Sequence, residues 1–348
     1  MIENNEQLPK DSPGPEAPKD DLLISVCLLD DDSPLLLSSL MAVLKALERA
    51  PGTAVEIGVY SRSSAVSFSL DEVVKRFPDL RIVVLPWHTH RVDMLNYALR
   101  RSSGRFVLFL NSDIILDRDF FTRFLPYAGK LNLFSLAFDV RTVHDPVVFQ
   151  TAGMEDDLIP SGDSFELGKT SFSGDLLGID LKPGLPADAP SLFTFSGAGC
   201  FRRDALLQMD GFNGKYKFAG YGFCADLDLC YRAWESGYGT LYAPELKVWH
   251  CGLSNAGAFY SALPVADHEP FFDRFAWNVL YKLFLIRHGL PVKIGAFLAG
   301  VFKNLGVLDL LTLLIALLIR LFQPGKKRSL KPVYGFDKIR EITSRDVL

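Results

Sequence analysis

The sequence predicts an α/β protein built around a mostly parallel sheet, and three observations predict it. Short apolar or β-branched runs that suit buried strands recur at residues 22–29, 55–60, 81–85 and 106–110. Helical patterns lie between them, at residues 35–49 and 92–101. The chain has 348 residues, 49% of them hydrophobic, which is enough for one large core with an appendage. Strands that alternate with helices are typical of right-handed βαβ units and therefore of parallel sheets.

Polar side chains follow three of these strands. Asp30 ends the first strand and opens a run of three acids, while Ser61 and Arg62 follow the second strand. The fourth strand is an apolar run that stops abruptly at Asn111 and Asp113. Because α/β proteins bind ligands at the carboxyl ends of their strands, these residues are candidates for a site. The acids at residues 30–32 could equally form a turn and a helix cap, and Asp113 could be an ordinary turn residue.

The second half of the chain repeats this arrangement of strand ends and acids. A Gly-rich segment at residues 196–199 precedes a predicted helix that begins with Asp226 and Asp228, and a strand at residues 246–249 ends at His250. The two acids could instead be solvated residues that the helix dipole favours. Residues 153–190 are rich in Gly, Asp, Ser and Pro, and this composition predicts a long loop that serves as a lid or substrate wall.

Charge and cysteine content exclude some classes of protein. The formal net charge of −4 and the pI of about 5.9 argue against a general nucleic-acid binder, which usually presents a basic surface. Five cysteines without disulfide-framework spacing suit reduced thiols in the cytoplasm. Residues 1–21 are rich in Pro, Glu, Asp and Asn and lack a signal-peptide pattern, so we expect a disordered N-terminal tail.

The C-terminal region has a different character. Residues 289–330 are strongly apolar, but Asp309 and Arg320 leave only a short uncharged stretch, which is too short for a simple spanning helix. We expect two amphipathic helices in the membrane interface, with residues 326–328 contacting anionic headgroups. The alternative is a helical subdomain that packs on the core. Residues 331–348 would form a C-terminal tail. The location expected on these grounds is cytoplasmic, peripheral on the inner face of the cell membrane.

In order along the chain, these motifs resemble the family 2 inverting glycosyltransferases of the GT-A fold. They are most similar to the rhamnosyltransferase-like branch that builds bacterial cell-surface polysaccharides. The resemblance covers roughly residues 24–287. The segments that carry it are residues 24–29, 56–60, 96–113, 196–203, 211–213, 226–232 and 250–252. It implies a GT-A, Rossmann-like domain at residues 22–288, with a mostly parallel sheet flanked by helices.

The resemblance also implies roles for individual residues. Asp113 and His250 would bind Mn²⁺ or Mg²⁺ on the diphosphate of a nucleotide-sugar donor, since carboxylate and imidazole ligands suit these ions. Asp226 would be the general base that activates the acceptor, a lipid-linked or nascent polysaccharide. The residues expected to contact the donor are Asp30, Ser61, Arg62, Asn111 and Gly197.

Three positions depart from the family pattern. Ala225, Asn111 and Ser61 each stand where the resemblance leads one to expect an acid. Asp228 could compensate in part for the acid missing at position 225, although it points to a different face of the helix. If the site is a working one, a glutamate at position 225 should be tolerated. The departures leave a second hypothesis open, in which the chain is a catalytically weakened GT-A domain that serves as a binding or assembly subunit.

Overall fold

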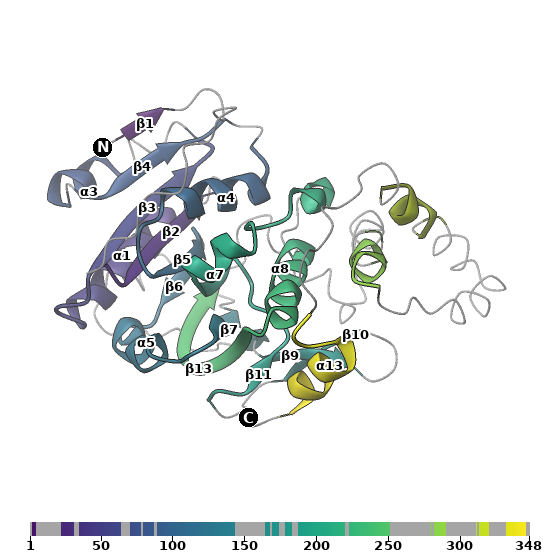
Figure 1. Cartoon of the computed structure of the whole chain (residues 1–348). Helices are drawn as coiled ribbons and strands as arrows, with labels where there is room; N and C mark the ends of the chain where they lie inside the picture. The colour runs from purple at the N-terminus through teal and green to yellow at the C-terminus, as the bar shows by residue number, and fades with distance from the viewer. Residues whose placement is uncertain are drawn as a thin grey trace.

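The computed structural model contains one large sheet with helices around it (Figure 1). The structure describes residues 2–4, 22–30, 35–63, 70–77, 79–86, 89–142, 164–167, 169–173, 178–182, 187–219, 223–250, 279, 282–289, 311, 313–319 and 332–345. Within this part of the chain, eleven strands belong to the large sheet. The prediction of an α/β fold with a largely parallel sheet is confirmed.

The N-terminal half of the sheet is parallel throughout. Its order is β1 (Ile2–Asn4), β4 (Arg81–Val84), β3 (Val55–Ser61), β2 (Ile24–Asp30) and β5 (Phe106–Asn111). Four of these strands lie where the apolar runs predicted them. The fifth, β1, lies within the segment predicted as a disordered tail, and the composition of that segment gave no signal for a strand. The rest of residues 1–21 lies outside the described residues.

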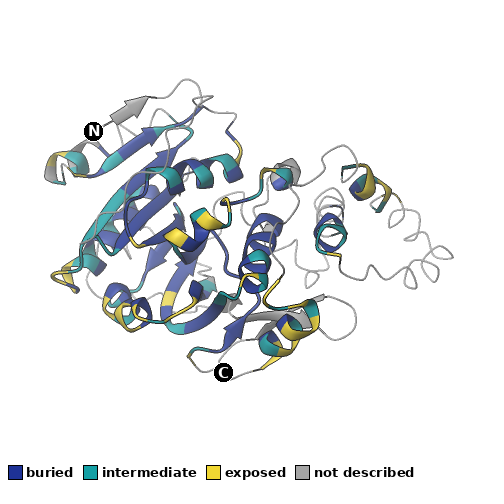
Figure 2. Cartoon of the chain, in the orientation of Figure 1, coloured by how far each residue is buried: buried dark blue, intermediate teal, exposed yellow. Residues whose placement is uncertain are grey.

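Helices cover the strands of this half. α1 (Leu36–Glu48) and α4 (Arg91–Arg101) lie where the helical patterns predicted them, and both bury their apolar residues. α3 (Asp71–Arg76) and α5 (Phe120–Ala128) complete this set. Figure 2 shows the central strands as buried and the outer surfaces of the helices as more exposed. One continuous apolar cluster joins the central strands to the inner sides of α1, α4 and α5.

The second half of the sheet mixes directions. β12 (Ala198–Arg202) is antiparallel to both β5 and β7 (Leu133–Thr142), so it reverses the direction of the sheet once. β13 (Gly239–His250) is parallel to β7, and the short β6 (Ile114–Leu116) pairs antiparallel with the end of β13. Because β12 is antiparallel to two strands, β5, β7 and β13 run the same way. Their carboxyl ends therefore lie at one edge of the sheet.

The segment predicted as a long loop contains strands instead. β8 (Ser164–Leu167) pairs with β7, β9 (Lys169–Ser173) pairs with β10 (Gly178–Lys182), and β11 (Pro190–Ser191) pairs with β13. These strands are only two to five residues long. Polar and apolar residues alternate in β8 and β10, as is typical of strands, but the surrounding Gly, Asp, Ser and Pro hid that pattern.

The remaining helices follow β12 in the sequence. α7 (Arg203–Gln208) and the 3₁₀ helix η2 (Gly214–Ala219) precede α8 (Phe223–Glu235), which begins as predicted just before Asp226. Residues 282–287 and 313–319 are also helical. Among the described residues, no helix has both the length and the apolar character needed to cross a bilayer.

The described part of the predicted C-terminal tail is folded. α13 (Phe336–Ser344) contacts β9 and β11, and it buries Ile339 and Thr343. Just before it, the Val333 N–H donates a hydrogen bond to the Glu235 carbonyl oxygen at 2.6 Å. The buried residues are four apart and thus lie on one face of the helix. This face attaches the end of the chain to the core.

Candidate active site

Asp113 and His250 face each other at the carboxyl edge of the sheet. Asp113 lies in the turn between β5 and β6, and His250 is the last residue of β13. The pairing of β6 with β13 sets Ile114 opposite His250, which brings the two side chains together. Asp113 Oδ2 lies 3.2 Å from His250 Nε2, and the side chains are only 1% and 2% exposed. The structure thus brings together the two residues predicted to share a metal, while the metal role itself stays a prediction.

The chemistry of this pair fits a hard divalent cation. A carboxylate oxygen and an imidazole nitrogen are ligands that Mn²⁺ accepts, and Mg²⁺ accepts the carboxylate. The described residues contain no group of three or more His, Cys, Asp or Glu side chains that could hold a metal ion. Such ions commonly complete their coordination with substrate phosphates and water. A protein contribution of two ligands is therefore compatible with a donor-dependent metal site.

Asp226 lies in the first turn of α8 and is 1% exposed. Its Oδ2 accepts a hydrogen bond from the Ser196 N–H at 3.1 Å. Among the described residues, Oδ1 has no hydrogen-bond partner. Burial raises the pKa of Asp226 to about 7, although the bond from Ser196 and the charge of Arg91 act in the opposite direction. A carboxyl group with a pKa near neutrality has the property that a general base needs.

Asn111 and Gly197 lie beside this carboxylate, and Arg91 joins them. The Asn111 N–H donates a hydrogen bond to the Gly197 carbonyl oxygen at 2.7 Å, and Arg91 Nη2 donates one to Asn111 Oδ1. A Cβ atom at Gly197 would lie 3.0 Å from Asn111 Nδ2, so only glycine fits here without a shift of the amide. Ser196, the neighbour of Gly197, connects this group to Asp226.

Arg91 was not predicted as part of the site, and the contact of the Ser196 N–H with Asp226 was not predicted either, although the segment at residues 196–199 was. Arg91 is the first residue of α4, the helix that follows a strand of the parallel half. That position was the available signal, because the start of such a helix lies at the ligand-binding edge. The role of Ser196 comes from its backbone, which no side-chain pattern reveals.

Asp30 and Ser61 form a second pair at the same edge. They are the last residues of β2 and β3, and the register sets them side by side. Ser61 Oγ donates a hydrogen bond to Asp30 Oδ2 at 2.7 Å, and both residues are buried. α1 is capped at Leu35 without a side-chain hydrogen bond, so Asp30 is not its cap. Arg62 follows them and is partly exposed.

Ala225 stands at the position where an acid was expected, and Asp228 is the nearby acid that could replace it. Ala225 is fully buried within the main apolar cluster. A glutamate there would place a charge among apolar side chains, so the expectation that the substitution is tolerated is not supported. Asp228 forms an ion pair with Arg232, with 2.8 Å between Oδ2 and Nε. It is engaged on another side of α8, and it does not replace the missing acid.

Comparisons with known proteins bear on the family and the fold. A family model described as "Glycosyltransferase like family 2" matches residues 18–261. The crystal structure of GalNAc-T7 with UDP, GalNAc and Mn²⁺ is 13% identical, with a TM-score of 0.50 over 84% of this chain and 55% of that one. The likeness thus spans about half the length of GalNAc-T7, and it shows the fold. No curated protein sequence gives a significant match.

Two further solved structures resemble the chain more loosely. One is the mannosyltransferase PcManGT from Pyrobaculum calidifontis in complex with GDP-Man and Mn²⁺. It is 14% identical, with a TM-score of 0.45 over 92% of this chain and 81% of that one. The other is S. aureus TarS 1–349, which is 13% identical, with a TM-score of 0.47 over 89% of this chain and 94% of that one.

Proposed function

Since this chain belongs to the glycosyltransferase-like family 2, we propose that it is an inverting glycosyltransferase. It moves a sugar from a nucleotide-diphosphate donor to a lipid-linked or nascent cell-surface polysaccharide. One observation supports the proposal: the residues to which the family resemblance assigns the base and the metal have suitable surroundings. Asp226 is a buried carboxyl group with a pKa of about 7, and Asp113 faces His250. A base and a metal-binding pair are the two elements that such a transfer requires.

Donor binding is assigned to the carboxyl edge of the sheet. Asp113 and His250 would hold Mn²⁺ or Mg²⁺, which when bound neutralises the charge that develops on the leaving diphosphate. The guanidinium of Arg91 adds a fixed positive charge on the same side. The donor sugar would also contact Gly197, where the absence of a Cβ lets the Asn111 amide pack against the backbone. The end of β2 and β3, with Asp30, Ser61 and Arg62, would contact the nucleoside.

Asp226 would act as the base. The acceptor hydroxyl oxygen forms a bond to the anomeric carbon while the bond from that carbon to the diphosphate oxygen breaks, and the hydroxyl proton passes to Asp226. Attack from the face opposite the diphosphate inverts the anomeric configuration. The Ser196 N–H holds Oδ2 in place, which fixes the carboxylate for proton transfer. Its raised pKa makes Asp226 a stronger base than an exposed aspartate.

Membrane association is part of the proposal, and one helix supports it. Leu311, Leu314, Leu317 and Leu318 are each 46–50% exposed, whereas Ala316 is fully buried. The helix at residues 313–319 therefore turns one side to the protein and leaves leucines exposed on the other, as Figure 2 shows by its mixed colours. An exposed leucine face suits the interface of a membrane. The basic residues 326–328 lie outside the described residues.

A second candidate function is a weakened GT-A domain that binds donor or acceptor for a partner enzyme. The observation that favours it is Ala225, which is buried in the apolar core at the position where the family resemblance predicts an acid. Ser61 and Asn111 also stand where the resemblance predicts acids, and they favour the same candidate function. This candidate predicts nucleotide binding without turnover, so the two functions separate in an assay of transfer.

Thermal unfolding with UDP, GDP, CDP or dTDP, each with and without Mn²⁺, tests donor and metal binding together. We expect one diphosphate to stabilise the chain only when Mn²⁺ is present, by about 2.7 kcal/mol at a concentration of 100 times Kd. Asp113→Ala and His250→Ala should each abolish this shift. Asp337→Ala, which removes a carboxylate that is 90% exposed on α13, is the matched control. A full shift in either site variant would show that its residue is not a ligand.

Release of nucleoside diphosphate from UDP-glucose, UDP-N-acetylgalactosamine, GDP-mannose and dTDP-rhamnose then tests turnover. Mn²⁺-dependent release by the wild-type chain supports the enzyme. Binding of a diphosphate without release from any of these donors, with or without an oligosaccharide acceptor, supports the weakened domain.

A further inference from the structure

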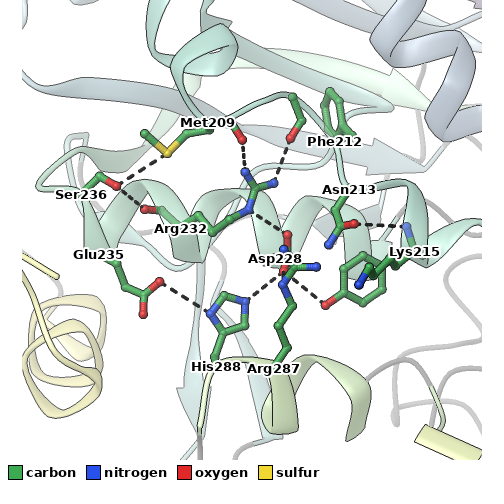
Figure 3. A network of polar contacts seen from close by, with 12 residues as sticks. Met209, Phe212, Asn213, Lys215, Asp228, Arg232, Glu235, Ser236, Arg287 and His288 are labelled. Carbon is green, nitrogen blue, oxygen red and sulfur yellow. Dashed lines mark hydrogen bonds and ion pairs between the residues drawn. The ribbon is translucent and has the colours of Figure 1, made fainter. Parts of the chain in front are cut away.

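A buried network of polar contacts surrounds Asp228 on α8 (Figure 3). Its centre is Asp228, whose side chain is fully buried. Asp228 Oδ2 lies 2.8 Å from Arg232 Nε. Its Oδ1 lies 3.2 Å from Arg287 Nε and 2.9 Å from His288 Nε2. One carboxylate thus contacts two guanidinium groups and an imidazole.

The partners decide the ionisation of this carboxyl group. Burial alone would raise the pKa of Asp228, but Arg232, His288 and Arg287 together hold it well below its ordinary value. Asp228 is therefore a buried anion that is compensated by its neighbours. A buried charge that keeps its partners is stable, whereas removing one partner is costly.

The network also ties α8 to the segment before it. Arg232 donates hydrogen bonds to the carbonyl oxygens of Met209 and Gly211. The Tyr216 hydroxyl donates one to Asp228 Oδ1 at 3.2 Å. α8 is thus fixed to residues 209–216 on one side.

On another side, a helix from much later in the chain lies along α8. His288 Nδ1 lies 3.6 Å from Glu235 Oε2, while Nε2 of the same ring faces Asp228. The ring of His288 also packs against Tyr231, with 4.6 Å between ring centroids. Positions 228, 231 and 235 recur at helical spacing, so they form one stripe of α8. Asp226 precedes Asp228 by two residues and lies on the other side of the helix.

Arg287 and His288 come from outside the part of the chain that the family model matches, which ends at residue 261. Nevertheless, the His288 side chain is fully buried against α8. A segment that merely followed the domain would not be expected to supply a guanidinium group and an imidazole to a buried carboxylate of the core. The contacts indicate that residues 282–288 complete the domain.

We propose that residues 282–288 are a brace that holds α8 in place, and that Asp228, Arg287 and His288 are positioning residues for Asp226. This inference rests on the proposed function, in which Asp226 is the base. Asp226 is held by its own contact with Ser196 on one side of α8, and the brace holds the other side. A displacement of the base by about 1 Å would lower the rate of transfer by roughly 100-fold.

The test uses the full-length protein and four variants. Arg287→Ala and His288→Ala remove the brace contacts, and Arg287→Lys keeps the charge. Arg340→Ala is the matched control, since Arg340 is an exposed arginine on α13 that pairs with an acid of its own helix. Hydrogen exchange is measured on peptides within residues 223–235, and kcat and KM are measured for Mn²⁺-dependent release of diphosphate from the best donor. All readouts are taken at a temperature where each variant is folded.

We expect the two alanine variants to exchange the amides of α8 faster and to lower kcat about 100-fold with little change in the donor KM. Arg287→Lys should recover most of kcat, and Arg340→Ala should match the wild type. Wild-type exchange in both alanine variants would overturn the brace. Faster exchange with an unchanged kcat would overturn the positioning role. If the wild type releases no diphosphate from any donor, the proposed function fails, and the exchange of α8 alone decides whether the brace exists.

Discussion

Two sides of α8 carry two aspartates in opposite electrostatic states. Asp226 and Asp228 are two residues apart, and both are buried. Asp226 accepts a hydrogen bond from the Ser196 N–H, and burial raises its pKa to about 7. Asp228 is surrounded by three cationic or imidazole groups, and its pKa lies well below the ordinary value.

The difference shows that burial alone does not decide what a buried acid does. Burial raises the pKa of both groups, but only Asp228 has enough opposite charge around it to reverse the effect. An acid whose ionised form is stabilised by its neighbours suits a structural role, because it stays ionised at little cost in free energy. An acid with little positive charge near its carboxylate suits proton transfer, because its pKa stays raised. The predictions below test this contrast.

Asp226→Asn should have the largest effect. It keeps the shape of the side chain but removes the base, so kcat for transfer should fall by about 10²–10⁴-fold. Steady-state kinetics on a competent acceptor, with Kd values for the diphosphate and Mn²⁺, measure this. Both affinities should stay close to the wild type. A variant that turns over at the wild-type rate would remove Asp226 from the mechanism.

Asp228→Asn should act on stability instead. Loss of the carboxylate leaves Arg232, Arg287 and His288 without their common counter-charge, which should lower the free energy of unfolding by about 3–5 kcal/mol. Urea denaturation at pH 8 gives this value, with Asp226→Asn as the matched control because it makes the same substitution on the other face. We expect the control to be at least as stable as the wild type. Equal free energies of unfolding in the two variants would show that Asp226 and Asp228 do not differ in their contribution to stability.

Ala225→Glu should also destabilise the chain, by about 1–3 kcal/mol from overpacking alone and by more if the carboxyl group ionises. The reason is that Ala225 is fully buried in the apolar core. Thermal unfolding at pH 5 and pH 8 measures both parts, and Ala225→Gln separates size from charge. No transfer by the wild type with any donor, together with transfer by a stable Ala225→Glu variant, would instead support the weakened-domain hypothesis, because it would show a missing acid restored.

The smallest effects concern pH. Transfer should require the Asp226 carboxylate, so kcat/KM should rise as pH increases through about 7.

The contributions of Asp226 and Asp228 to folding stability should change with pH in opposite directions. The raised pKa of Asp226 makes its contribution fall as pH rises from its ordinary value of 3.8 to about 7. The depressed pKa of Asp228 makes its contribution present above the ordinary value and lost as pH falls below it. Unfolding free energies of the wild type and the two asparagine variants from pH 3 to pH 8 separate these slopes.

Much of the fold followed from local patterns in the sequence. The strands that became β2 to β5 are long apolar runs, and the helices between them bury apolar stripes. β8, β9 and β10 were missed because they are short and lie among turn-forming residues. The reversal at β12 was not predicted either, since its direction depends on pairing with β5 and β7 rather than on its own sequence.

The part of the candidate site that could be predicted consists of polar side chains at the ends of strands. Asp113 and His250 stand directly after apolar strands, and the structure places them 3.2 Å apart. Ser196 contributes a backbone N–H, which any residue except proline provides, so no residue type marked it. Two partners of Asp228, Arg287 and His288, come from a distant segment, and long-range contacts of this kind leave no periodic pattern in the sequence.

The charge cluster at Asp228 also has a consequence for the order in which the protein is made. His288 is 60 residues further along the chain than Asp228. At about 5–20 residues per second, the ribosome adds His288 roughly 3–12 s after Asp228. During that interval Arg232 is already present, but Arg287 and His288 are not. The nascent chain can therefore pair the strands that precede residue 250 first, while the contacts that fix α8 are completed only after residue 288 has been added.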